Sequence, residues 1–130
     1  MTSAFLSSAP AVDYASNTIS RTYPRGLDVE IFSFVALEHA WENDNSTNWR
    51  EHVTPYIHQQ PDKFRLLHVI NPVDFSHYRL TVDTPQDLEL VRRIYSYFGH
   101  TNFGWRDLLA AFVEHPEWES INRDITQKPL

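Results

Sequence analysis

A single carboxylate, Asp83, stands at the position where this chain of 130 residues most strongly indicates chemistry. It lies in the stretch TVDTPQDLELV, between residues that favour a strand and residues that mark the start of a helix. A carboxylate at such a junction can hold Mg²⁺, which often takes only one or two protein carboxylates and completes its shell with water and substrate phosphates. A purely structural role is also open, because the helix dipole favours an Asp at this place.

The segment from Tyr23 to Asp28 combines an aromatic ring, Arg25, Gly26 and a carboxylate within one turn. Arg can form a forked pair with a carboxylate ligand, and Asp28 can accept hydrogen bonds from sugar hydroxyls. Gly26 lets the backbone approach another group closely or adopt a positive φ. The alternative is a tight turn whose Arg and Asp are solvated or paired with each other.

A third candidate is the run Arg50, Glu51 and His52, which stands at the head of VTPYI. The seven histidines otherwise favour core or surface roles over zinc, because no HExxH pair is present. His68 sits inside an apolar stretch and is expected in the core. The four tryptophans occur at helix positions and are expected to pack rather than to stack on bases. With only three glycines, a loop that cradles phosphates within this chain is not expected.

The strands that must position these residues follow from runs of β-branched and aromatic side chains. Four strands are expected, over residues 12–19, 29–34, 64–70 and 77–82. The first two precede and follow the 23–26 turn. The last two are expected to pair with each other across the loop 71–76.

The expected helices are marked by their ends. Ser33 can cap a helix that carries Val35, Leu37, Ala40 and Trp41, and Pro55 argues against an uninterrupted helix through Trp49, Val53 and Tyr56. Thr84 is expected to be the N-cap of an amphipathic helix whose first residue is Pro85 and whose third is Asp87, and Gly99 is expected to end this helix. A further helix through Trp105, Leu108, Leu109 and Phe112 stops before Pro116.

Length and composition predict one folded domain over residues 1–130. The net charge of −6 argues against nucleic acid as a partner. The chain has no cysteine, which fits a reducing compartment, and no apolar stretch long enough for a membrane span. With no basic leader at its start, the chain is expected to be a cytoplasmic, soluble protein.

Three stretches, YASNTISRTYPRGLDVEIFSF, REHVTPYI and HYRLTVDTPQDLELVRRIY, resemble the later part of the cytidylyltransferase family. The similarity runs in order from about Asp13 to Lys128. The subgroup it is most similar to is the spore coat polysaccharide biosynthesis protein F type, related to CMP-KDO synthetase and acylneuraminate cytidylyltransferase.

The resemblance implies a nucleotide-diphospho-sugar transferase-like fold of α/β class, with a short mixed sheet packed by amphipathic helices. It also implies a transferase of polysaccharide biosynthesis, a nucleotidyltransferase that moves CMP from CTP to a sugar acid. By the same resemblance, Asp83 helps bind catalytic magnesium (Mg²⁺). Tyr23, Arg25, Gly26 and Asp28 lie near the sugar-binding face, together with Arg50, Glu51 and His52.

The family's early Gly- and Arg-rich CTP loop and its mid-chain metal-binding Asp have no counterpart in this sequence. We therefore expect a fragment of α+β character, truncated or one piece of a split protein, that is not active alone. Exposed sheet edges would favour a homodimer or other homo-oligomer, or a missing N-terminal partner. The alternative is a non-catalytic sugar-binding or dimerisation module. A small metal-dependent hydrolase is a third possibility, but no residue spacing near Asp83 demands a second ligand.

Overall fold

The computed structural model describes residues 1–8 and 10–126, apart from the side chains of Asn48, Arg50 and Glu51. Their contacts divide into two compact units, each described here by itself. The first unit comprises Met1–Tyr23 and Asp28–Asp74, and the second comprises Pro24–Leu27 and the chain from Phe75 onward. The prediction of a single domain over residues 1–130 stays a prediction.

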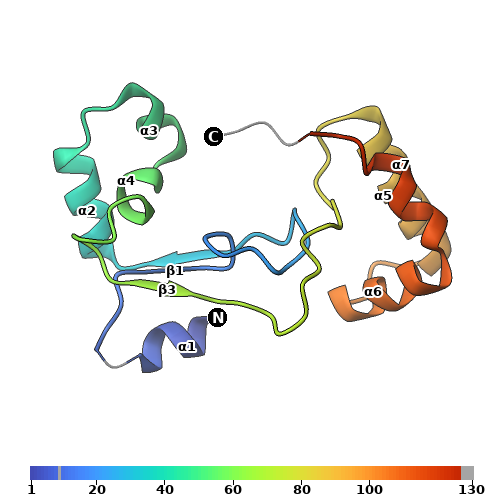
Figure 1. The fold of residues 1–130 in the computed structure, drawn as a ribbon, viewed down its shortest axis with the longest axis horizontal. Helices are drawn as coiled ribbons and strands as arrows, with labels where there is room; N and C mark the ends of the chain where they lie inside the picture. The colour runs from blue at the N-terminus through green and yellow to red at the C-terminus, as the bar shows by residue number, and fades with distance from the viewer. Residues whose placement is uncertain (9, 127–130) are drawn as a thin grey trace. The chain divides into compact units, whose positions relative to one another are not determined.

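The first unit is built on a three-stranded mixed sheet of strand order β2-β1-β3 (Figure 1). The central strand β1 (Tyr14–Ser16) is antiparallel to β2 (Glu30–Phe32) and parallel to β3 (Leu66–His68). All three residues of β1 are buried, as expected for a strand that has a neighbour on each side. The predicted α/β class with a short mixed sheet packed by helices is confirmed.

The predicted pairing of residues 64–70 with residues 77–82 is wrong. β3 pairs with β1, and the segment 77–82 makes only an isolated parallel bridge between Arg79 and Arg25 in the second unit. An apolar pattern identifies a strand but not its neighbour, and β1 lies far from β3 in the sequence.

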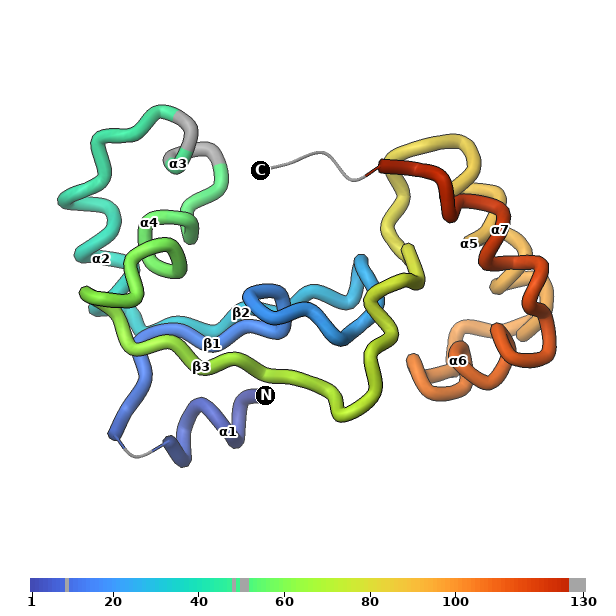
Figure 2. The backbone as a smooth tube through the Cα atoms, viewed as in Figure 1, coloured from blue at the N-terminus to red at the C-terminus, as the bar shows by residue number. Residues whose placement is uncertain are grey.

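In the described part of the first unit there are four helices, and the tube view traces them in order (Figure 2). They are α1 (Thr2–Ser7), α2 (Phe34–Asn43), α3 (Thr47–His52) and α4 (Pro55–His58). Ser33 caps α2 as predicted, since its Oγ accepts a hydrogen bond of 3.1 Å from the amide of Ala36. The predicted interruption before Pro55 is confirmed, because α3 ends at His52 and α4 starts at the proline.

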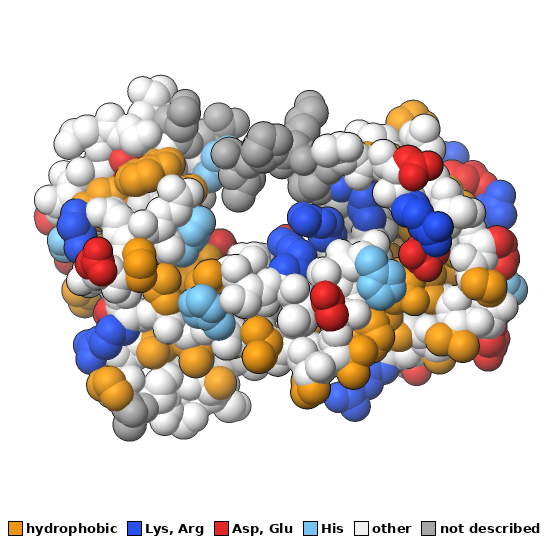
Figure 3. All heavy atoms as spheres, in the orientation of Figure 1, with side chains coloured by type: hydrophobic (Ala, Val, Ile, Leu, Met, Phe, Trp, Pro, Cys, Tyr) orange, Lys and Arg blue, Asp and Glu red, His pale blue; other side chains and the backbone are white. Residues whose placement is uncertain are grey.

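Helix α2 buries small side chains and exposes large apolar ones. Figure 3 shows that apolar side chains are present at the surface of the protein. Ala36 and Ala40 are buried, whereas Val35 is 71% exposed. The expected packing role holds for Trp118, which is 4% exposed, and is wrong for Trp41, which is 73% exposed. The helical period alone therefore did not show which face of α2 meets the sheet.

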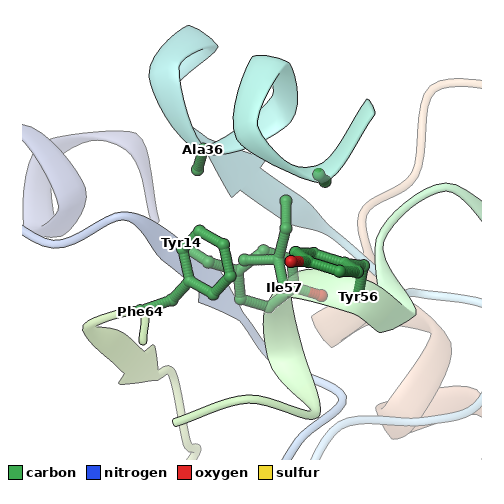
Figure 4. Close-up of a cluster of buried hydrophobic side chains, with 6 residues drawn as sticks. Tyr14, Ala36, Tyr56, Ile57 and Phe64 are labelled. Carbon is green, nitrogen blue, oxygen red and sulfur yellow. The ribbon is translucent and has the colours of Figure 1, made fainter. Parts of the chain in front are cut away.

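The core of the first unit gathers aromatic and aliphatic side chains from β1, α2, α4 and the residue Phe64 (Figure 4). The expected place of His68 in this core is wrong, because the residue is exposed and its Nδ1 lies 3.0 Å from Ser20 Oγ. The buried members of the cluster are Tyr14, Ala36, Ala40, Tyr56, Ile57 and Phe64.

The second unit is helical: α5 (Pro85–Phe98), α6 (Trp105–Glu114), the 3₁₀ turn η1 (Pro116–Trp118) and α7 (Glu119–Asn122). The predicted start of α5 is confirmed, with Thr84 and Asp87 in a capping box, and so is its end at Gly99, which has a φ of 67°. In the described part of the chain, no helix is both long and apolar enough to cross a membrane. The core consists of Leu90, Ile94, Leu108, Ala111, Phe112 and Trp118.

Candidate functional site

The start of α5 is organised around a buried carboxylate, Asp87, whose side chain is fully buried. Arg79 donates to it twice, from Nε to Oδ1 at 2.9 Å and from Nη2 to Oδ2 at 3.1 Å. Asn122 of α7 donates from Nδ2 to Asp87 Oδ1 at 2.8 Å and to the carbonyl oxygen of Arg79 at 3.0 Å. One carboxylate thus joins the 78–80 segment, the start of α5 and the end of α7.

The protonation of Asp87 is fixed by this network. Burial by itself would raise the pKa of the Asp87 carboxyl, but the hydrogen bonds from Arg79, Asn122, the Asp83 amide and Thr84 outweigh burial and hold the pKa well below its usual range. The hydrogen bond to Asp87 is also the main cause of the raised pKa of Arg79. Both groups are therefore charged at neutral pH.

Asp83 lies at the surface beside this network, with 57% of its side chain exposed. Its Oδ2 accepts a hydrogen bond of 2.7 Å from Arg79 Nη2, and its amide donates to Asp87 Oδ2 at 3.1 Å. The carboxylate is thereby held in one orientation at the head of α5 while remaining accessible to a ligand from solvent.

The donor set suits a hard cation bound by a single protein carboxylate. In the described ranges, no group of three or more His, Asp or Glu side chains is arranged to hold a metal ion. Mg²⁺ needs no such cage, because water and substrate phosphates can supply most of its ligands. The role of Asp83 as one ligand of a Mg²⁺ site stays a prediction.

Arg25 and Gly26 lie in the second unit, against the segment that leads to Asp83. The Arg25 amide donates to the carbonyl of Tyr78 at 2.9 Å, and the Leu80 amide donates to the Arg25 carbonyl at 2.7 Å. Gly26 has a φ of 96°, and a Cβ there would lie 2.7 Å from the backbone of Leu80 and Thr81. Both the close approach and the positive φ predicted for Gly26 are confirmed.

The other two residues of the predicted sugar-binding turn, Tyr23 and Asp28, belong to the first unit. Asp28 pairs with Arg21, whose Nη2 donates to Asp28 Oδ2 at 2.9 Å, in a fork that leaves Arg25 out. Arg21 was not among the predicted site residues, and because it lies seven positions before Asp28 in a segment that is not helical, no helical pattern could have identified the pair.

The third predicted group lies at the end of α3. The side chains of Arg50 and Glu51 are outside the described residues, so their substrate-binding role stays a prediction, and His52 is exposed. Directly after His52, Val53 has a φ of 62° and a ψ of −53°, and the Thr54 amide donates to the His52 carbonyl at 2.7 Å. This three-residue turn is strained for a β-branched residue.

A polar network in the first unit supports that strained turn. The Thr54 hydroxyl donates to Glu30 at 3.1 Å, and the Tyr14 hydroxyl donates to Glu30 Oε1 at 2.6 Å. Burial, followed by the bond to Glu30, raises the pKa of Tyr14 above its ordinary range. Burial also lowers the pKa of the nearby His58 against the opposing charge of Glu30. No sequence motif marked these residues, because they come from separate elements.

Comparison with known proteins gives two matches. Over 99% of this chain and 53% of the other, the structure is similar to that of a cytidylyltransferase from Leptospira borgpetersenii serovar Hardjo-bovis, with a TM-score of 0.86 and 32% sequence identity. An uncharacterized protein of Methanocaldococcus jannaschii is 35% identical over 105 residues, which cover 79% of this chain and 43% of that protein. No family model matches the chain. The chain thus spans about half the length of the proteins it matches.

Proposed function

We propose that this chain is part of a cytidylyltransferase that transfers CMP from CTP to a sugar acid for surface-polysaccharide synthesis. The observation that carries the proposal is the similarity to the Leptospira cytidylyltransferase, which extends over 99% of this chain at 32% identity. That match supports a nucleotidyltransferase-like function. The sugar-acid substrate and the spore coat polysaccharide F type subgroup rest in addition on the segments RTYPRGLDVEIF and REHVTPYI.

In the proposed reaction, a hydroxyl of the sugar acid attacks the α-phosphorus of CTP. A new bond forms between that oxygen and phosphorus, the bond to pyrophosphate breaks, and the hydroxyl proton passes to solvent. Bound Mg²⁺ would neutralise negative charge on the phosphates as they rearrange. Asp83 would supply one ligand for it, and Arg79 keeps that carboxylate in place through the 2.7 Å hydrogen bond.

The other predicted residues have the chemistry to hold the sugar acid. Arg25 can bind a carboxylate, while Asp28 can accept hydrogen bonds from sugar hydroxyls. Tyr23, Arg50, Glu51 and His52 are proposed to contact the same substrate, and Gly26 supports it by allowing the close approach of two backbone segments. Since the chain covers about half of the matched cytidylyltransferase, we expect CTP binding to need a further segment that carries a Gly- and Arg-rich loop.

The test is pyrophosphate release from CTP in the presence of Mg²⁺ and a panel of sugar acids. The chain would be assayed alone and with a complementing fragment that carries such a CTP-binding loop. We expect release only in the complemented mixture. If the mixture neither releases pyrophosphate nor binds CTP by calorimetry, the proposal fails and a non-catalytic sugar-binding or dimerisation module is favoured instead.

We further propose that the protein self-associates and acts in the cytoplasm. Self-association is supported by the large apolar side chains that α2 exposes, namely Phe34, Val35 and Trp41. A chain without cysteine suits a reducing compartment. Analytical ultracentrifugation at micromolar concentration tests the first point, and a strictly monomeric protein would contradict it.

A further inference from the structure

A pocket of about 260 Å³ in the second unit is lined mainly by cationic and polar side chains. Three of its lining residues are arginines, Arg25, Arg79 and Arg123, and His77 and Asn122 also contribute. Among the described residues, neither Asp nor Glu lines the pocket. The volume is below the usual range of ligand pockets, roughly 300–1,000 Å³, so it suits one anionic group rather than a whole nucleotide.

The backbone sets the positions of the first two guanidinium groups. Arg25 and Arg79 are partners in a parallel bridge, and residues paired in this way project their side chains to the same face. The bridge is held by the amide of Arg25 on one side and the amide of Leu80 on the other. It also depends on the contact of Gly26 with residues 80 and 81, which leaves no room for a Cβ.

Hydrogen bonds with buried residues hold two of the lining side chains in place. Arg79 is anchored by the fully buried Asp87, which therefore lies on the protein side of the guanidinium. Asn122, 4% exposed, donates to both residues and ties α7 to the pocket. Two lining side chains are thus held rigidly before any ligand arrives, so little conformational entropy is lost on binding.

The charges in the pocket are unequally compensated. Asp87 and Asp83 balance Arg79. Glu119 lies 3.1 Å from Arg123 in a partly exposed pair that contributes little. Arg25 is half-buried, and among the described residues no hydrogen bond or ion pair to its guanidinium is found. A half-buried guanidinium without a counter-ion favours binding of an anion.

We propose that this pocket binds an oxyanion, the carboxylate or phosphate group of a small molecule, with Arg25 and Arg123 as the direct contacts. The identity of the natural ligand rests on the proposed function, which would make it a group of the sugar acid or of the released pyrophosphate. The binding itself does not depend on turnover. Arg79 and Asn122 serve to position the site, since Arg79 donates to Asp87 and Asp83, and Asn122 donates to Asp87 and to the Arg79 carbonyl.

The experiment titrates the isotope-labelled protein with three anions, inorganic phosphate, pyrophosphate and glucuronate, and with glucose as the neutral partner of glucuronate. Amide chemical shifts are followed by NMR spectroscopy. We expect saturable shifts at residues 25, 77 and 122 with at least one anion and none with glucose. Tighter binding of glucuronate would identify a carboxylate site, and tighter binding of phosphate or pyrophosphate a phosphate site.

Two matched variants test whether anions bind in this pocket. Arg25→Gln should weaken binding about tenfold, because one charge-assisted hydrogen-bond partner is lost. Arg92→Gln removes the same charge from an exposed position on α5 outside the pocket and should leave affinity within about twofold. Both spectra should keep the native dispersion, because it is the backbone of Arg25 that forms the bridge.

Two results would overturn the proposal: shifts that rise linearly without localising to the pocket, or equal affinity in Arg25→Gln and wild type. Because no CTP is present, a negative result here leaves the pyrophosphate-release test of the proposed function unaffected. Conversely, anion binding without any transferase activity in the complemented mixture would support the pocket as a binding site and contradict the proposed transferase function.

Discussion

Arg79 and Asp87 form an ion pair whose two side chains are only 7% and 0% exposed. Their contact spans two hydrogen bonds, and Asn122 adds a third donor to the same carboxylate. A buried pair of this kind need not add stability over an apolar pair, but loss of one partner leaves the other charge buried and unpaired. The structure of the second unit therefore depends on both partners.

Replacing Asp87 by Asn should lower the free energy of unfolding by about 3–5 kcal/mol, because the buried Arg79 would lose its buried counter-charge and keep only its pair with the exposed Asp83. Urea unfolding followed by circular dichroism measures the change. Asp107→Asn is the matched control: Asp107 holds the same helix position in α6, where its Oδ2 accepts from the Gly104 amide at 2.7 Å, but it is exposed. Its loss should cost about 0.5–2 kcal/mol. Equal costs for the two variants would mean that burial of the pair matters little.

The lowered pKa of Asp87 predicts how stability depends on pH. Because the folded pKa lies below that of an unfolded Asp, about 3.9, the contribution of Asp87 is fully present above that value. It is lost as the pH falls through the lower pKa of the folded protein. The difference in unfolding free energy between wild type and Asp87→Asn should therefore shrink when the pH drops from 5 towards 2. A constant difference over that range would show that Asp87 is not the responsible group.

Gly26→Ala should be far more damaging than Gly99→Ala. Both glycines have positive φ, but a Cβ at Gly26 would lie 2.7 Å from the backbone of Leu80 and Thr81, whereas nothing lies within 4 Å of one at Gly99. We expect a loss of about 1 kcal/mol at Gly99 from backbone conformation alone, and at least a further 1–3 kcal/mol at Gly26 from the clash. Thermal unfolding of the two variants measures this. Similar losses of stability in the two variants would mean that the positive φ causes the destabilisation and that the close approach of the backbone at Gly26 adds nothing to it.

The second unit was the more predictable part of the fold, because its signals are local. Thr84, Pro85 and Asp87 identify the start of α5 within four residues, and Gly99 marks its end. Strand pairing was not predictable in the same way. Nothing in residues 64–70 indicates that their partner is β1 and not the nearer segment 77–82.

The candidate site shows the same division. The conformation of Gly26 follows from its type, and the capping role of Asp87 follows from its spacing to Thr84. Its more consequential contacts, to Arg79 and to Asn122, join residues 8 and 35 positions apart and follow no period. The pairing of Asp28 with Arg21 is equally invisible in the sequence, since any nearby cation could have served.

Val53→Gly should raise stability, unlike most substitutions of an apolar residue by glycine. Val53 has a φ of 62°, which costs a β-branched residue about 1–3 kcal/mol, and relief of this strain should exceed the roughly 0.5–1 kcal/mol that glycine loses through backbone entropy. Val113→Gly, at a 78% exposed position within α6, should instead lose roughly 0.3–0.5 kcal/mol, the difference between the helix propensities of Val and Gly. Urea unfolding separates the two cases. A loss at position 53 would mean that the Val53 side chain contributes more by packing than its backbone costs.

Asp83→Asn should remove the proposed Mg²⁺ half-site while leaving the fold intact. Because 57% of the Asp83 side chain is exposed, its pair with Arg79 should contribute less than about 1 kcal/mol to stability. Titration with Mn²⁺, a paramagnetic substitute for Mg²⁺, should broaden the amide signals at the head of α5 in the wild type and not in Asp83→Asn. Asp62→Asn, which removes an equal charge from an exposed position in the first unit, should broaden those signals as the wild type does. In the complemented mixture, only the Asp83 variant should lose metal-dependent pyrophosphate release. Broadening that survives in Asp83→Asn would exclude this carboxylate as the ligand.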